Sequence, residues 1–84
     1  WRNKAKYEVD FIVKPGRGQI THAIECKNKS KNFDPSGIRA FRKIHSSGRN
    51  FLVAADVKEV EEVLVGGLTV IQCPLDQITA QLNG

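Results

Sequence analysis

The first two apolar runs of the chain alternate between hydrophobic and polar positions with a period of two, which predicts β-strands. Run 4–13 reads KAKYEVDFIV and run 19–27 reads QITHAIECK, and the turn residues KPGRG between them predict an antiparallel hairpin. The side expected to be buried carries Val9, Phe11, Val13, Ile24 and Cys26. The side expected to be charged carries Glu8, Asp10, Ile12, Ala23, Glu25 and Lys27.

A helical pattern follows the polar, lysine-rich connection KNKSKNF. In segment 34–48, Asp34 is expected to cap the helix and Pro35 to occupy its first position, with Gly48 beyond its end. The apolar residues at helical spacing are Ile38, Phe41 and Ile44.

The last third of the chain predicts a strand, a helix, a strand and a helix. NFLVAA (50–55) is a continuous apolar run, typical of a strand that is covered on both faces. Segment 56–67 has the capping-box spacing of Asp56 and Glu59, which predicts a helix that ends at its two glycines. The expected apolar stripe of that helix is Val57, Val60 and Leu64. LTVIQC (68–73) predicts the last strand, and PLDQITAQLNG (74–84) predicts a short amphipathic helix.

The predicted order over residues 1–84 is therefore β-β-α-β-α-β-α in a single domain. This order predicts an α/β fold with a mixed sheet flanked by helices, in which segments 50–55, 56–67 and 68–73 form a βαβ unit. A domain of 84 residues buries only about 60% of the surface of its unfolded chain, so a partner or additional sequence would support it. Because the chain begins at Trp1 without Met, we expect a fragment of a longer protein.

Charge is distributed unevenly along the chain. Residues 1–50 hold 12 Lys and Arg against 4 Asp and Glu, a net +8, whereas residues 51–84 hold 1 against 5, a net −4. A basic half suits an acidic partner such as nucleic acid, although a solvated surface explains the same charges. No apolar run approaches the roughly 20 residues that span a bilayer, so neither a membrane span nor a signal peptide is expected.

The cysteines and histidines are expected to be structural. Cys26 and Cys73 are too few for a disulfide scaffold and lack zinc-ligand spacing, which predicts two structural thiols in a reducing, cytoplasmic compartment. His22 alternates with Ile24 toward the core, and His45 lies near a helix C-terminus, where it favours the helix dipole.

Candidate chemistry lies where the predicted hairpin brings carboxylates together. With a two-residue loop at 17–18, Asp10 lies opposite Glu25 and Glu8 opposite Lys27. A four-residue loop shifts the partners by two and keeps all four side chains on one face. A loop of odd length without a bulge would place the acids of the two strands on opposite faces.

Like charges that face each other across two strands destabilise the pair, and two arrangements offset this. Glu8 and Glu25 could form ion pairs with Lys27 on a solvated face of the sheet. Alternatively, a divalent cation could lie between the carboxylates, since Mg²⁺ favours one or two of them together with waters and phosphate oxygens. Lys27 would then orient the attacking water or stabilise charge on a phosphate, as in a phosphodiester-cleaving site.

Asp10, followed after fourteen residues by Glu25-Cys26-Lys27, resembles the PD-(D/E)xK nuclease signature. More narrowly, the segments EVDFIV, AIECKNKS, GIRAFRKI and IQCPL resemble the C-terminal domain of unknown function of a family of prokaryotic AAA-type ATPases, over roughly residues 1–75. The resemblance implies a restriction-endonuclease-like fold and a nuclease that requires Mg²⁺ or Mn²⁺. It implies that Asp10, Glu25 and Lys27 are catalytic and that Asp10 and Glu25 bind the metal.

The chain departs from the nuclease pattern in two places. Val9 stands where the signature has a proline. The first helix and strand of the nuclease core, which often add a Glu to the metal site, are expected to be missing, and Glu8 is the expected substitute ligand. Because the chain has no G-x-x-x-x-G-K-[ST] loop, ATP chemistry is expected in an upstream ATPase domain of the same chain.

Nucleic acid, with DNA favoured over RNA, is the expected partner, and an oligomer is compatible with the sequence. A basic rim that could hold phosphates follows the expected site at Lys29, Lys31, Arg39, Arg42, Lys43 and Arg49. The residues assigned to nucleic-acid binding are Lys29, Lys31, Arg39 and Lys43. Base stacking is not expected, because the four Phe occupy core positions and only Trp1 and Tyr7 remain.

Two hypotheses besides a metal-dependent nuclease stay open. One is a non-catalytic regulatory module of the ATPase that binds nucleic acid or a protein. The other is a scaffold domain whose acidic face simply pairs with lysines, which predicts neither metal nor DNA binding.

Overall fold

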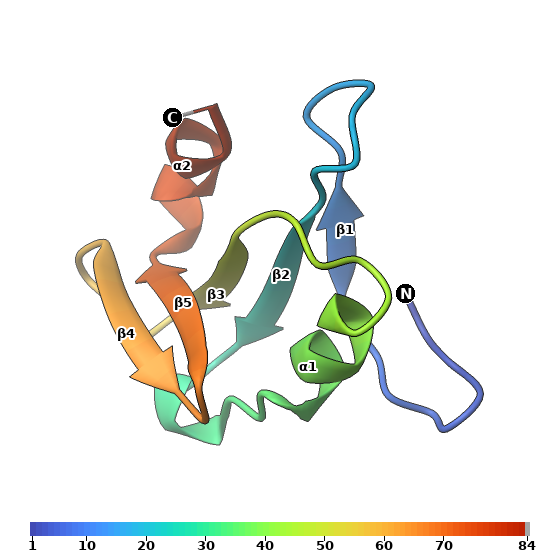
Figure 1. Cartoon of the computed structure of the whole chain (residues 1–84). Helices are drawn as coiled ribbons and strands as arrows, with labels where there is room; N and C mark the ends of the chain where they lie inside the picture. Colours follow the sequence, from blue (N-terminus) through green and yellow to red (C-terminus); the bar gives the residue numbers. More distant parts are fainter. Residues whose placement is uncertain (84) are drawn as a thin grey trace.

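The computed structural model describes residues 1–83, which form a small α/β domain with a mixed five-stranded sheet and two α-helices (Figure 1). The strands are β1 (Phe11–Val13), β2 (His22–Lys27), β3 (Asn50–Ala54), β4 (Glu61–Val65) and β5 (Leu68–Cys73). The helices are α1 (Ser36–Arg42) and α2 (Ile78–Asn83), each preceded by a 3₁₀ turn, η1 (Ser30–Asn32) and η2 (Leu75–Gln77).

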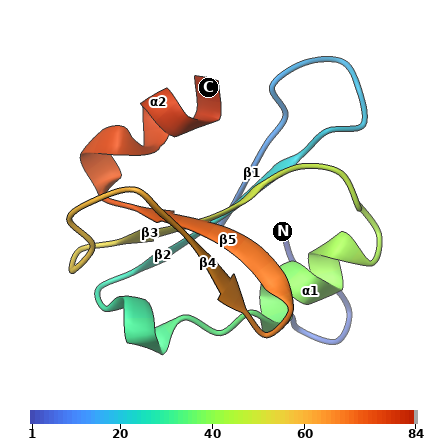
Figure 2. The same cartoon turned by 60° about the vertical axis from the view of Figure 1, so that its left-hand side comes forward.

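The sheet has the strand order β1-β2-β3-β5-β4. The three central strands β2, β3 and β5 run parallel, and the edge strands β1 and β4 are antiparallel to their neighbours. Figure 2 shows the sheet nearly edge-on, with α2 above it and α1 below it. Because helices cover both faces, the middle strand β3 is buried at every residue, as its continuous apolar run predicts.

Each helix closes one layer of the core. Beneath α1 lies a cluster of Val9, Ala23, Ile38 and Phe41. Beneath α2 lies a cluster of Ile24, Phe51, Val53 and Cys73, against which Ile78 and Leu82 of α2 pack. A third cluster, of Leu52, Ala54, Val57 and Val70, continues the α1 layer toward β4.

The predicted helix at 56–67 is wrong, because this segment forms strand β4 and a hairpin to β5. Its two glycines adopt positive φ angles of 54° and 85°, which suit a tight β-hairpin turn rather than the end of a helix. In the strand, Val63 lies opposite Val70 and packs on the core. Leu64, which the helical stripe predicted to be buried, is 74% exposed. The order is therefore β-β-α-β-β-β-α, with β3 and β5 parallel as expected for the predicted βαβ unit.

Asp56 does not cap a helix. Its carboxylate accepts hydrogen bonds from the backbone N–H of Ser30 at 2.9 Å and from the Ser30 hydroxyl at 3.2 Å. The side chain that looked like a helix cap therefore ties the loop after β3 to the loop after β2. A capping box has no sequence feature that distinguishes it from such a long-range contact.

The predicted sides of the hairpin also need correction. Phe11 is 58% exposed, and Cys26, predicted as a buried structural thiol, is exposed. Both lie on the α2 side of the sheet, where the six-residue helix reaches Val13 but not Phe11. On the other side Ala23 is fully buried under α1. When helices cover both faces of a sheet, both sides of a strand carry some apolar residues. The alternation of apolar and polar residues therefore could not show which side chains are buried and which are exposed.

Helix α1 begins where the sequence predicts and ends earlier. The Asp34 carboxylate accepts a hydrogen bond from the backbone N–H of Ser36 at 2.9 Å, which satisfies one amide of the first turn. Ile44, expected on the buried stripe, lies beyond the helix and is 64% exposed. Gly37 has a packing role, because a Cβ at this position would collide with the backbone carbonyl oxygen of Glu8. The helix can therefore lie directly against the chain that leads into β1.

Candidate functional site

A pocket of about 280 Å³ opens between the segment before β1, the end of β2 and the first turn of α1. It contains all four residues that the sequence predicts as catalytic or metal-binding. We call it the acidic pocket, and its lining consists of Lys6, Tyr7, Glu8, Asp10, Glu25, Lys27, Asp34, Ser36 and Gly37.

Strand register places the two carboxylates side by side. Phe11 pairs with Ile24 and Ile12 with Ala23, so continuing the register by one residue sets Asp10 opposite Glu25. This is the register expected for a two-residue loop at 17–18, although the connection between the paired strands is longer. Glu25 accepts a hydrogen bond from the Asp10 backbone N–H at 3.3 Å. Asp10 in turn accepts one from the Cys26 backbone N–H at 2.9 Å.

Glu25 is the most unfavourably placed charge in the acidic pocket. It is only 7% exposed, and the loss of solvent raises its pKa above the usual carboxyl value. The neighbouring Asp10 charge raises that pKa further and Glu8 adds to the effect, whereas the hydrogen bond from Asp10 and the charge of Lys27 oppose it. A bound cation would stabilise the ionised form of this pair of carboxylates.

The donor set suits a hard cation that keeps waters. Glu25 Oε1 and Asp10 Oδ2 are used by backbone amides, and the second oxygen of each carboxylate accepts none of the hydrogen bonds found in residues 1–83. In that described part of the chain, no three His, Cys, Asp or Glu side chains group closely enough to hold a metal ion by themselves. Mg²⁺ takes one or two carboxylates and completes its shell with waters and phosphate oxygens, so Asp10 and Glu25 fit it.

Glu8 and Lys27 lie on the rim of the same pocket. The Glu8 carboxylate is 3.8 Å from the Arg2 guanidinium, and both side chains are more than half exposed, so the ion pair is weak. Lys27 is exposed, and its side chain forms no hydrogen bond or ion pair with any described residue, which leaves its ammonium group available to a ligand. Its charge favours ionisation of both Glu25 and Asp34.

Five lining residues were not predicted as site residues: Lys6, Tyr7, Asp34, Ser36 and Gly37. Hydrogen bonds from Ser36 lower the pKa of Asp34, so this carboxylate adds a negative charge to the rim. Nothing in the local sequence identifies these residues, because the pocket forms only where the segment before β1 meets the first turn of α1.

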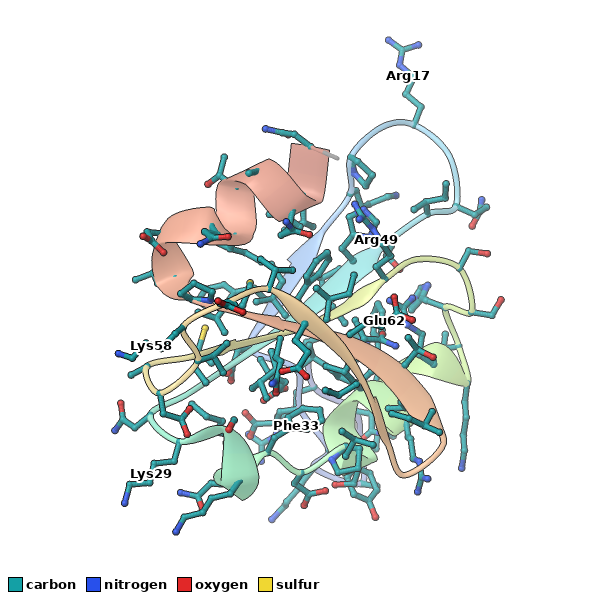
Figure 3. The ribbon with its side chains drawn as sticks, turned by 90° about the vertical axis from the view of Figure 1, so that its left-hand side faces the viewer. Arg17, Lys29, Phe33, Arg49, Lys58 and Glu62 are labelled. Atoms are coloured by element: carbon teal, nitrogen blue, oxygen red, sulfur yellow. The ribbon has the colours of Figure 1, made fainter. Side chains whose placement is uncertain are left out.

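Arg39 and Lys43 line a second, smaller hollow of about 210 Å³ on α1. Tyr7 and Ser36 line both this basic hollow and the acidic pocket, so the two are contiguous. Lys29 and Lys31 line neither of them and are exposed near η1. Figure 3 shows Lys29 pointing away from the body of the domain.

Arg42 and Arg49, expected in the basic rim, have structural contacts instead. The Arg42 guanidinium donates hydrogen bonds to the carbonyl oxygens of Thr21 and Arg49 at 3.0 and 2.9 Å and to the Asn50 side-chain oxygen at 2.8 Å. Burial lowers its pKa. Arg49 donates to the Gln81 carbonyl oxygen and lies over the Phe51 ring. The spacing of charges along the chain does not distinguish such arginines from those that face solvent.

The histidines have the structural environments that the sequence predicts. His22 is 6% exposed, packs edge-on against Phe51 and accepts a hydrogen bond at Nδ1 from the Arg49 backbone N–H. Its burial, followed by the charges of Arg49 and Arg42, lowers its pKa. His45 is exposed and its ring lies 4.8 Å from that of Phe41.

The fold and the pocket define a class, a small mixed-sheet α/β domain with a neighbouring pair of carboxylates, one exposed and one buried, and an adjacent lysine. No family model, curated protein or solved structure matches the chain. Within residues 1–83, no helix has both the length and the apolar character needed to cross a membrane.

Proposed function

We propose that this domain is a nuclease-type hydrolase that requires a divalent cation and acts on nucleic-acid phosphodiesters. The observation that carries the proposal is the convergence of Asp10, Glu25 and Lys27 on one pocket, with Asp10 directly before β1 and opposite Glu25 of the adjacent strand β2. Both carboxylates accept backbone hydrogen bonds, but this role does not require two neighbouring negative charges, whereas a cation held between them turns their repulsion into affinity.

Each residue has a distinct task in this mechanism. Asp10 and Glu25 would hold Mg²⁺ or Mn²⁺ with the carboxylate oxygens that the backbone amides leave unused. Such an ion, when bound, would make a water more acidic and would offset phosphate charge. Lys27 donates a hydrogen bond to the attacking water or to a phosphate oxygen as negative charge develops on it. Glu8 is a third ligand in this proposal once it leaves the weak ion pair with Arg2.

The basic hollow positions the substrate backbone. Arg39 and Lys43 lie on α1 directly beside the acidic pocket, where they can bind phosphates that flank the scissile bond. Lys29 and Lys31 contribute a non-specific attraction for the nucleic-acid backbone in this proposal. Exposed charges attract phosphates over distances up to the Debye length, about 10 Å at 0.1 M salt.

A restriction-endonuclease-like fold is part of the proposal. It is supported by an antiparallel hairpin carrying Asp10 and the Glu25–Lys27 pair, followed by α1 and a parallel strand. An ATPase module in the same polypeptide is supported by the sequence resemblance alone.

Plasmid nicking in the presence of Mg²⁺ or Mn²⁺ tests the hydrolase. We expect supercoiled plasmid to be nicked by the wild-type chain, and the Lys27→Ala variant to reduce the rate by about 10²-fold or more. Lys58→Ala is the matched control, because it removes an exposed lysine from the loop between β3 and β4. Equal nicking by the wild type and Lys27→Ala would reject catalysis at this site.

Calorimetric titration with Mn²⁺ separates the hydrolase from a binding module. The wild type is expected to bind Mn²⁺, and Asp10→Asn and Glu25→Gln are each expected to abolish measurable binding while the fold is kept. If both variants bind Mn²⁺ as the wild type does and DNA affinity persists, the domain is a non-catalytic nucleic-acid-binding module.

A further inference from the structure

Another pocket, of about 400 Å³, is distinct from both the acidic pocket and the basic hollow. It lies at the other end of α1 from the acidic pocket. Three ring side chains form its walls: Trp1, Phe41 and His45. The Trp1 and Phe41 ring centroids are 5.2 Å apart at an interplanar angle of 79°, and those of Phe41 and His45 are 4.8 Å apart at 31°. We call it the aromatic pocket. Its volume falls in the range of about 300–1,000 Å³ that is usual for small-ligand sites.

The rest of the lining is suited to a planar ring that carries an anion. Ile12 gives an apolar surface, Gln19 supplies an amide, and Lys14 supplies a positive charge, whereas the buried Thr21 hydroxyl is already bonded to Ser47 and Arg42. None of the described residues that line the aromatic pocket is acidic. Rings for stacking, an amide for hydrogen bonding and one cation are the features that recognise a nucleobase attached to a phosphate.

Strand β1 and the residues flanking it connect the aromatic pocket to the acidic pocket. Asp10 lines the acidic pocket, and Ile12 and Lys14 line the aromatic pocket. These three positions alternate along an extended segment and share its α1 side, because Ile12 packs on the α1 cluster. Two residues of strand advance about 7 Å, so one nucleic-acid strand can reach both pockets.

We propose that the aromatic pocket binds an unpaired base of a single-stranded nucleic acid whose backbone passes the acidic pocket. Phe41 is 1% exposed, so the rings that a ligand can reach are those of Trp1 and His45. A base inside a duplex presents only its edges, so only an unpaired or flipped base can stack on these rings. The proposal rests on the proposed function for the identity of the ligand as nucleic acid, and it narrows the substrate to single-stranded or locally unpaired strands.

Trp1 reports directly on this pocket, because it is the only tryptophan of the chain. Its fluorescence is titrated with a short oligothymidylate, with the matching duplex and with thymidine monophosphate, in chelator and without a divalent cation. We expect saturable quenching by the oligonucleotide. We expect the duplex and the mononucleotide each to bind at least about tenfold more weakly, since the duplex lacks a free base and the mononucleotide lacks the flanking backbone.

Two exposed residues provide variants that should not affect the core. His45→Ala removes one stacking ring, and we expect it to weaken oligonucleotide binding about fivefold or more. Lys14→Ala removes the pocket's cation, and Lys58→Ala removes one from the loop between β3 and β4 as the matched control. Lys14→Ala is expected to weaken binding more than Lys58→Ala. Circular dichroism and labelled-oligonucleotide anisotropy check folding and binding independently of Trp1.

Several outcomes would overturn the inference. They are equal affinity for duplex and single strand, absence of quenching, mononucleotide binding as tight as that of the oligonucleotide, and wild-type affinity of His45→Ala. Failure of the proposed hydrolase is distinguishable, because the titration excludes metal and cleavage. Quenching by the oligonucleotide without cleavage of either the plasmid or that oligonucleotide in Mn²⁺ would reject catalysis alone, and cleavage without quenching would reject the aromatic pocket alone.

Discussion

The backbone amide of Asp10 donates a hydrogen bond to the Glu25 carboxylate at 3.3 Å, across the only strand pair that β1 forms in residues 1–83. The Asp10 carboxylate in turn accepts a hydrogen bond at 2.9 Å from the backbone amide of Cys26, the next residue along β2. This reciprocal arrangement orients both carboxylates with backbone groups and leaves the repulsion between their charges in place. The backbone hydrogen bonds allow the two carboxylates to lie side by side in the folded domain. A bound cation would stabilise the pair further by offsetting the repulsion between their charges.

The charge of Glu25 is therefore expected to destabilise the folded domain at neutral pH. Glu25→Gln keeps an oxygen for the Asp10 amide and removes the charge, so we expect it to raise the free energy of unfolding by about 0.5–1 kcal/mol. Because its folded-state pKa is raised, Glu25 binds its proton more tightly in the folded protein. The free energy of unfolding of the wild type should then decrease as pH rises from 4.5, the ordinary pKa of a Glu side chain, through the raised pKa of Glu25.

Urea unfolding of wild type and Glu25→Gln between acidic and neutral pH measures this difference. The two curves should converge at low pH and separate as pH rises. Added Mn²⁺ should raise the melting temperature of the wild type only, because a ligand that binds the folded state stabilises it. A Glu25→Gln variant that is less stable than the wild type at neutral pH would contradict the expected repulsion.

Gly37 is expected to be essential for the close approach of α1 to the chain before β1. Gly37→Ala should destabilise the domain by about 2 kcal/mol or more, since its Cβ would collide with the Glu8 carbonyl oxygen. Gly16→Ala is the matched control, because a Cβ at that position meets nothing within 4 Å. Thermal unfolding of both variants tests the contact, and equal melting temperatures would refute it.

Arg42 is expected to contribute to the stability of the fold, and Arg39 to DNA binding. Arg42→Lys should lower stability by about 2–3 kcal/mol, because an ammonium group cannot replace the guanidinium that bridges the carbonyls of Thr21 and Arg49. Arg39→Lys should leave stability nearly unchanged. Arg39→Ala should weaken DNA binding and reduce its salt dependence by about one counterion. Equal melting temperatures of the two Lys variants would contradict the structural role of Arg42.

His22 is expected to make the domain sensitive to mild acid. Burial and two arginine charges lower its pKa, so the unfolded chain takes up the proton first as pH falls below the ordinary value of 6.5. Stability should therefore be full above that pH and decrease from there toward the lowered pKa. The His22→Gln variant should flatten this part of the pH–stability curve, and an unchanged slope would assign the sensitivity to another group.

The sequence by itself determined most elements, and it predicted the observed register as one of the alternatives that depend on the turn. Period-two alternation around Glu25, the Asp34-Pro35 helix start and the continuous apolar run of β3 are local signals that overlap their elements, although α1 begins at Ser36. The run 4–13 forms a strand only at Phe11–Val13. Local signals failed at 56–67, where the capping-box pattern of Asp56 competes with a hairpin that two glycines favour. The pairing of Val63 with Val70 is itself local, since the two residues are seven apart. Their packing against Leu52 and Ala54 of β3 favours the hairpin, and that contact lies outside the segment.

Only the tertiary structure decided which charged side chains are available to a ligand and which ring side chains lie together in a pocket. Arg42 and Arg39 are three residues apart on one short helix, yet one is held by backbone carbonyls and the other lines an open hollow. Trp1, Phe41 and His45 form one pocket although Trp1 is forty residues away from the others along the chain, because β1 and α1 bring them together. Desolvation and long-range contacts set both outcomes, and neither is a property of a residue and its sequence neighbours.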